Sequence, residues 1–196
     1  RLRTLTPQDV LLTAQPFSYI DPQWNLAATL ASGATLVVLE RFRPSQFWSA
    51  VRRHEVSFFY CLGAMPALLL AQPASPAERE HRLRVVMCSG IPADRHAEQE
   101  TRFGVPWREV YGTTETGADV MVYADMAQAL RGSGSIGVAL PHRELRIGDD
   151  EARPVPRGQV GELLIRGTAM MDGYFRNAQA TQSAFASGWY HTGDLA

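Results

Sequence analysis

The chain has 196 residues, of which 45% are apolar and 20% are charged, and its formal net charge is -1. This is the composition of a globular protein that buries a normal core, in one domain or in one domain and part of another. The balanced charge and the short apolar runs exclude a basic nucleic-acid surface, a surface for anionic membranes and a transmembrane segment.

Apolar runs and helical patterns alternate from residue 10 to about residue 111. The runs at 10–17 and 34–40 are short and nearly continuously apolar, as buried parallel strands are. Further strand patterns cover 56–62, 83–90 and 106–112. The helical patterns lie between them, at 21–33, 43–55, 63–72 and 92–104. This alternation predicts an α/β fold with a mostly parallel sheet flanked by helices.

The first two helical patterns also indicate ends and faces. In the first, we predict Asp21 as the N-cap, Pro22 as the first helical residue and Gly33 as the stop. The second is amphipathic. We predict that Phe47, Trp48 and Val51 face inward, and that Arg52, Arg53 and Glu55 face solvent.

After about residue 131 the pattern changes to alternating strands joined by Gly, Pro and Asp turns, at 142–150, 159–170 and 188–196. One helical pattern, at 177–186, interrupts them. We therefore predict an α/β subdomain at 1–131 and a smaller, truncated, barrel-like β-rich subdomain of the same domain at 132–196.

The stretch "GSGSIG" (132–137) matches the glycine spacing of a dinucleotide-binding turn. That mechanism requires a strand before the glycines and a helix after them. Here a helical pattern precedes them and a strand-like stretch with Pro141 follows. The interpretation as a flexible glycine turn is therefore preferred.

Other common chemistries have little support. Cys61 and Cys88 lie in apolar runs, which indicates buried free thiols and a reducing cytoplasm, and the N-terminus lacks the apolar region of a signal peptide. The histidines are scattered without metal-binding spacing. Ser89 is outside any nucleophile elbow, and no Ser-His-Asp set is visible, so hydrolase chemistry is disfavoured.

Two polar stretches follow predicted strands directly, "CSGIP" (88–92) and "YGTTE" (111–115). Ligands of open α/β sheets bind beyond the carboxyl ends of the strands. Taken alone, "YGTTE" has two interpretations, a structural turn or a nest of oxygen and amide groups for a charged ligand.

The order and spacing of "YGTTE", "GELLIRGTAMMDGYF" and "GWYHTGDLA" resemble the core signatures of the adenylate-forming (AMP-binding) superfamily. This superfamily contains acyl-CoA synthetases, adenylation domains of peptide synthetases and luciferases. The resemblance covers essentially the whole chain, and the stretch 30–73 looks most like the branch that contains crotonobetaine/carnitine-CoA ligases and short or medium acyl-CoA synthetases. It implies a ligase that uses ATP, Mg²⁺ and CoA, acts on a small carboxylic acid and belongs to fatty acid metabolism.

The resemblance also implies the roles of individual residues. Glu115 would bind Mg²⁺, and Thr114 would face the α-phosphate, so these two are the predicted catalytic residues. Tyr111 would stack on adenine with Gly90 on the other side, Gly112 would let the backbone come close, and Asp194 would accept hydrogen bonds from the ribose. The full predicted nucleotide set is Ser89, Gly90, Ile91, Pro92, Glu109, Val110, Tyr111, Gly112, Thr113, Thr114 and Asp194.

An acyl pocket is predicted from residues at strand and helix ends that lie together on one side of the sheet. These residues are Phe17, Ser18, Tyr19, Trp24, Gly63 and Met65. Many acyl-CoA synthetases have histidine where Ser18 stands, so the role of that histidine does not transfer. Peptide-synthetase adenylation domains usually have aspartate directly after the phenylalanine, whereas Asp21 lies four residues after Phe17.

All 19 basic residues are arginine, and the phosphate loop and catalytic lysine of the family are not in the chain. We therefore expect an excerpt of a larger protein, inactive alone. The preferred function is formation of an acyl-adenylate and then of a CoA thioester. The alternatives are an amino-acid adenylation domain that loads a carrier protein, and an inactive homologue that serves as a nucleotide-binding or scaffold module.

Overall fold

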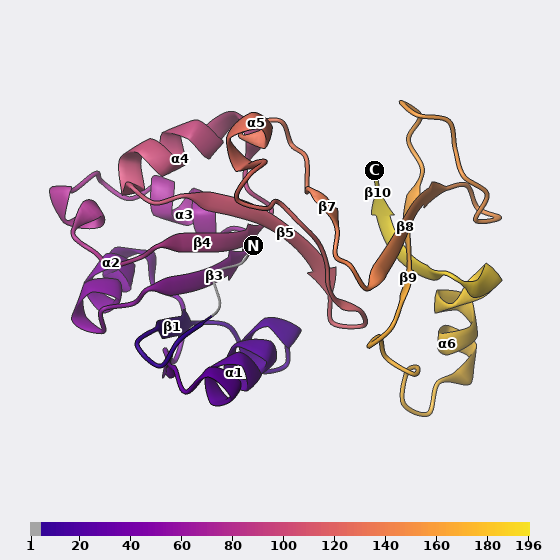
Figure 1. The fold of residues 1–196 in the computed structure, drawn as a ribbon, viewed down its shortest axis with the longest axis horizontal. Helices are drawn as coiled ribbons and strands as arrows, with labels where there is room; N and C mark the ends of the chain where they lie inside the picture. Colours follow the sequence, from indigo (N-terminus) through magenta and orange to yellow (C-terminus); the bar gives the residue numbers. More distant parts are fainter. Residues whose placement is uncertain (1–4) are drawn as a thin grey trace. The chain divides into compact units, whose positions relative to one another are not determined.

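The computed structural model describes residues 5–196 (Figure 1). The chain forms two compact units. The first extends to Tyr111 and also contains Met121–Gly137, and the second consists of Gly112–Val120 and Val138–Ala196. The two units are described separately, and the predicted division after residue 131 stays a prediction.

A seven-stranded sheet has the order β2-β1-β3-β4-β5-β6-β7. The pairs β1/β2, β1/β3, β3/β4 and β4/β5 are parallel, which confirms the predicted α/β fold with a mostly parallel sheet. The strand bounds are Val10–Thr13 for β1, Thr35–Val38 for β2, Phe58–Leu62 for β3, Val85–Ser89 for β4, Trp107–Thr113 for β5, Gly117–Met121 for β6 and Val138–Ala139 for β7.

Helices of the first unit cover both faces of its strands. Side chains alternate along β3, so Phe59 joins the main apolar core while Phe58 and Tyr60 pack against Trp24 of α1. The helix bounds are Ile20–Ser32 for α1, Pro44–Arg53 for α2, Met65–Leu70 for α3, His96–Phe103 for α4 and Ala127–Leu130 for α5, with 3₁₀ turns at Pro76–Arg79 and Ala93–Arg95.

Helix α1 differs from the prediction at its start. Its N-cap is Tyr19, and the predicted N-cap Asp21 instead lies in the first turn with a buried side chain. The predicted stop is confirmed, because Gly33 takes the left-handed conformation (φ 71°) that favours glycine. The buried residues of this helix are mostly polar, whereas Leu26 and Leu30 are exposed.

Helix α2 has the predicted inward face, since Phe47, Trp48 and Val51 are buried. The prediction that Arg52 stays in solvent is wrong. Its side chain is half-buried, and Nη1 donates a hydrogen bond to the carbonyl oxygen of Ala77 at 2.6 Å. The long arginine stem lets the guanidinium reach a neighbouring connection from a position that the helical pattern places outside.

The second unit contains a three-stranded antiparallel sheet in the order β10-β9-β8. Leu164, Ala152 and Trp189 form a small core, and the guanidinium groups of Arg146 and Arg166 lie over the Trp189 ring. The bounds are Arg143–Gly148 for β8, Glu162–Gly167 for β9, Ala178–Ala184 for α6 and Tyr190–Leu195 for β10, with a 3₁₀ turn at Ala186–Gly188.

The fold also bears on the two cysteines and on the glycine stretch at 132–137. Cys61 and Cys88 are free and buried. The stretch 132–137 follows α5 and precedes β7, the reverse of the strand–turn–helix order of a dinucleotide site. Within residues 5–196, no helix combines the length and apolar character that crossing a membrane requires.

Candidate nucleotide and substrate site

Glu109 of β5 holds the loop that follows β4. Its Oε1 and Oε2 accept hydrogen bonds from the backbone nitrogens of Gly90 and Ile91, at 2.6 and 3.0 Å. Ser89 donates to the carbonyl oxygen of Val110 at 2.6 Å, so a third hydrogen bond joins the same two segments. The first unit thus brings together five residues of the predicted nucleotide set, Ser89, Gly90, Ile91, Glu109 and Val110.

Two opposing effects act on the pKa of Glu109. Burial raises the pKa of Glu109, and the N–H groups of Gly90 and Ile91 act in the opposite direction by stabilising the carboxylate. Such a perturbed carboxyl group next to exposed backbone is typical of ligand sites.

The residues predicted for the acyl pocket have mixed environments. Phe17, Ser18 and Tyr19 are exposed on the segment before α1. Gly63 is exposed with φ 59°, and a Cβ added there would meet no atom within 4 Å. Met65 instead packs against the main apolar core. The solvent-facing members are therefore the ones available to a ligand.

Trp24 belongs to a cluster that includes two residues absent from the prediction, Asp21 and Tyr60. The rings of Trp24 and Tyr60 lie edge to face at 5.7 Å. Burial raises the pKa of Asp21, and hydrogen bonds with Tyr60 and Trp24 partly oppose this shift. Burial also raises the pKa of Tyr60, with a further contribution from the Asp21 charge. No residue spacing along the chain indicates this pair.

The motif at 111–115 is partly strand. Strand β5 extends through Thr113, and only three residues separate it from β6. Gly112 is needed for this close return, because a Cβ there would lie 1.9 Å from the carbonyl oxygen of Gly117. The glycine therefore permits two backbone segments to pack closely against each other. This local role is additional to the predicted close approach of a ligand.

Glu115 is held at both its backbone and its side chain. Its carbonyl oxygen accepts from the backbone nitrogen of Met171 at 2.8 Å, and its Oε1 accepts from the Tyr174 hydroxyl at 3.0 Å. Thr114 beside it is exposed. The predicted catalytic pair thus consists of one anchored carboxylate and one hydroxyl that faces outward. Tyr174 was missed because it lies 59 residues away along the chain.

The Glu115 carboxylate affects the pKa values of two nearby tyrosines, Tyr174 and Tyr190. Burial raises the pKa of Tyr190, and the nearby Glu115 charge raises it further. The pKa of Tyr174 is also raised, by burial and then by its hydrogen bond to Glu115. Both phenols are therefore held protonated, and Tyr174 is kept as a hydrogen-bond donor to the carboxylate.

The turn before Asp194 is shaped by Glu162 of β9. Glu162 Oε1 accepts from the backbone nitrogen of Gly193 at 2.8 Å, and its Oε2 lies 2.7 Å from Nδ1 of His191. The backbone nitrogen of Asp194 donates to the Thr192 hydroxyl at 3.0 Å. Asp194 is exposed at the end of this turn, where a ligand hydroxyl can approach it.

The donor set fits Mg²⁺ bound with a nucleotide better than a metal ion held by protein alone. No group of three or more His, Cys, Asp or Glu side chains is placed to hold a metal ion among residues 5–196. Mg²⁺ typically takes one or two carboxylates and fills its remaining positions with phosphate oxygens and water. A single anchored carboxylate, Glu115, matches that requirement.

Comparison with known proteins gives a consistent assignment. The sequence profile of a family described as AMP-binding enzyme matches residues 1–175. Crotonobetaine/carnitine–CoA ligase of Salmonella paratyphi C (strain RKS4594) is 36% identical over 196 residues, which cover 97% of this chain and 38% of the ligase. The ligase of the same name from Shigella sonnei (strain Ss046) is 38% identical, with the same two coverages.

Solved structures agree with these sequences. ATP-bound MatB from Rhodopseudomonas palustris has a TM-score of 0.81 at 28% identity, and the matched region covers 97% of this chain and 38% of the MatB chain. O-succinylbenzoate coenzyme A synthetase from Bacillus subtilis, in complex with ATP and magnesium ion, has a TM-score of 0.80 at 28% identity, with coverages of 98% and 40%. The chain spans less than half the length of these relatives.

Proposed function

This chain belongs to the family of AMP-binding enzymes, and on that premise we propose that it serves in the ATP-dependent activation of a carboxylic acid. The carboxylate attacks the α-phosphate of ATP, pyrophosphate leaves, and an acyl-adenylate forms. The CoA thiol then attacks the acyl carbon, a thioester forms, and AMP leaves with release of a proton. The observation that carries this proposal is the anchored Glu115 beside the exposed Thr114.

The chain's own residues divide the work of binding and charge stabilisation. Glu115 would bind Mg²⁺, which neutralises charge on the phosphate oxygens when it is present. Thr114 donates to the α-phosphate, and Tyr111 and Gly90 hold the adenine. Asp194 accepts from the ribose hydroxyls, in a turn that Glu162 already fixes. Because negative charge spreads over the phosphate in the transition state, fixed donors of this kind are what the reaction needs.

The substrate class follows from the relatives. Crotonobetaine and carnitine are the acids named for the sequence relatives, and we take a small acid of that kind as the first candidate, with short and medium fatty acids next. CoA is the proposed acceptor, and the cytoplasm is the proposed location.

A pyrophosphate-release assay on the full-length protein tests this function. The panel contains crotonobetaine, carnitine, short and medium fatty acids and amino acids, each with and without CoA. We expect release with at least one acid, and a CoA thioester as the final product. Absence of release with every acid contradicts the proposal, and release without any thioester contradicts CoA as the acceptor. The Glu115→Gln variant controls for release by a contaminating enzyme.

A further inference from the structure

Arg143, the first residue of β8, is a buried arginine in the second unit. Its side chain is 1% exposed, and that of its partner Asp119 is 0% exposed. Nε lies 2.5 Å from Oδ1 of Asp119, and the two terminal nitrogens donate to the carbonyl oxygens of Thr168 and Thr116. One guanidinium thus joins a carboxylate and two separate loops.

The same two loops meet at Glu115. Thr116 belongs to the connection that contains Glu115, and Thr168 begins the segment whose Met171 and Tyr174 bind the Glu115 backbone and side chain. Arg143 therefore ties together the two segments that fix Glu115, from a position where it is shielded from solvent.

Asp119 extends this contact toward Thr113. Its Oδ2 accepts a hydrogen bond from the Thr116 hydroxyl, so the Thr116 oxygen is left to accept one from the hydroxyl of Thr113, 2.9 Å away. The backbone nitrogen of Thr116 in turn donates to Thr113 Oγ1 at 3.2 Å. A continuous set of hydrogen bonds thus connects the buried ion pair to both ends of the turn that carries Thr114 and Glu115.

We propose that Arg143 and Asp119 are positioning residues for adenylation, and that their ion pair sets the geometry of the Thr113–Thr116 turn. This inference rests on the proposed function, in which Thr114 and Glu115 contact the nucleotide and its metal ion. Arg143 and Asp119 contact neither, since both are buried under the turn. Their effect is exerted through the position of the turn, and a displacement of about 1 Å in such a group lowers turnover by roughly 10²-fold.

The shape of arginine is essential to this role. Its planar group presents several donors in a fixed arrangement, whereas lysine presents one compact charge on a flexible stem. Lysine at 143 retains the charge opposite Asp119 but cannot reach both carbonyl oxygens with the same geometry. Burial raises the pKa of Asp119 in spite of Arg143, which indicates that desolvation opposes this pair.

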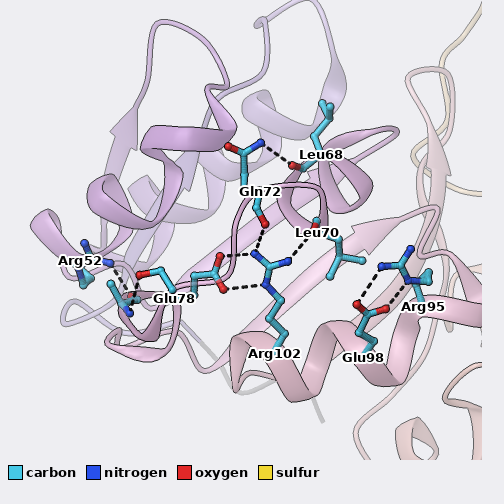
Figure 2. A network of polar contacts seen from close by, with 10 residues as sticks. Arg52, Leu68, Leu70, Gln72, Glu78, Arg95, Glu98 and Arg102 are labelled. Carbon is cyan, nitrogen blue, oxygen red and sulfur yellow. Dashed lines mark hydrogen bonds and ion pairs between the residues drawn. The ribbon is translucent and has the colours of Figure 1, made fainter.

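A second arginine provides a matched control (Figure 2). Arg102 of α4 donates to Glu78 at 2.6 Å and to the carbonyl oxygens of Leu70 and Gln72 at 2.6 and 2.7 Å. It therefore has the same arrangement of one carboxylate and two backbone oxygens. It lies in the first unit and contacts none of the proposed site residues. Its replacement therefore measures how the loss of such hydrogen bonds affects the protein when the proposed site is not involved.

The experiment compares Arg143→Lys with Arg102→Lys in the full-length protein. We expect Arg143→Lys to lower kcat by about 10- to 100-fold, with KM for the acid changed less than about twofold, because positioning acts on the reacting phosphate. Arg102→Lys should leave kcat within about twofold. A double variant, Arg143→Met with Asp119→Leu, removes both charges without leaving either unpaired, and it should fold while showing the same loss of kcat.

Amide hydrogen exchange of the 112–119 segment supplies a readout that does not depend on activity. We expect faster exchange there in both Arg143 variants and unchanged exchange in Arg102→Lys. Parent-like kcat in the folded double variant, or unchanged exchange of this segment, overturns the positioning role. If the parent protein releases no pyrophosphate, the proposed function fails, and the exchange measurement still decides whether the ion pair orders the turn.

Discussion

Oε1 of Glu109 lies 2.6 Å from the backbone nitrogen of Gly90, so a residue of β5 fixes the loop that leaves the neighbouring strand β4. Glu109→Gln replaces one of the two acceptor oxygens by an amide that faces an N–H group. We expect KM for ATP to rise by about tenfold or more, since a charged hydrogen bond contributes about 1.5–3 kcal/mol. Steady-state kinetics with varied ATP measures this change.

The matched control for this variant is Glu98→Gln. Glu98 is exposed and pairs with Arg95 on the surface of the first unit (Figure 2). Surface pairs of this kind contribute little, so its kinetics should equal those of the parent. Equal KM values for ATP in both variants would show that Glu109 does not shape the nucleotide site.

Glu115→Gln should reduce adenylation by orders of magnitude while the protein stays folded, because the change removes a charged ligand from Mg²⁺. Tyr174→Phe deletes only the hydroxyl that donates to Glu115, and its effect should be much smaller. Pyrophosphate release and circular dichroism of both variants provide the comparison. Near-normal turnover of Glu115→Gln would remove this residue from the proposed mechanism.

Asp194→Ala should raise KM for ATP much more than KM for the acid, because Asp194 is the proposed acceptor of the ribose hydroxyls. The loss of discrimination against 2′-deoxy-ATP is the sharper measurement. The parent should prefer ATP, and the variant should treat the two nucleotides nearly alike. Equal discrimination in both proteins argues against the ribose contact.

Replacement of Gly63 tests the acyl pocket. Gly63→Asn suits the left-handed backbone at φ 59° and adds a side chain where a Cβ meets no atom within 4 Å. We expect the preference to move toward smaller acids, with little change in stability. Gly158→Asn, at φ 88° and equally open, controls for the backbone effect. An identical acid profile in both variants would place Gly63 outside the pocket.

Asp9 should make the protein sensitive to acid. Burial acts to raise its pKa, but hydrogen bonds from Ser57 and Thr6 and the charge of Arg84 outweigh this and lower the pKa of Asp9 below its ordinary value. A depressed pKa contributes stability that is present above the unfolded value of about 3.9 and is lost as the pH falls through the folded value.

Asp9→Asn should therefore flatten the acid side of the stability curve. Denaturant unfolding from neutral pH down to about 3 would show a smaller fall in the free energy of unfolding than in the parent. Asp94→Asn, at an exposed position, is the surface control. A parent-like fall in Asp9→Asn would mean that other carboxyl groups determine the acid response.

Local patterns predicted much of the fold. The apolar runs became β1 to β5, and Gly33 ends α1, because hydrophobic patterning and backbone conformational preference are properties of short stretches. The prediction of the adenylate-forming family is also confirmed. Asp21 was wrongly placed as an N-cap because its environment depends on Tyr60, which lies on strand β3.

The site was predictable only as far as its motifs reach. Thr114, Glu115 and Asp194 stand in recognisable stretches, and their roles stay predictions. Arg143 and Asp119 are 24 residues apart, and nothing in an alternating strand pattern distinguishes a buried arginine from one on the surface. Such pairs depend on which side chains the tertiary structure brings together, and one sequence contains no local signal for that.

The tryptophan beneath Arg146 and Arg166 has a practical consequence. The chain's tryptophans are Trp24, Trp48, Trp107 and Trp189, and the first three fall in the first unit. Trp189 is 5% exposed, with guanidinium carbons 4.2 and 4.6 Å from its ring centroid. Its intrinsic fluorescence, isolated by replacing the other three with phenylalanine, would therefore report on the antiparallel sheet alone, as a built-in optical probe of the second unit.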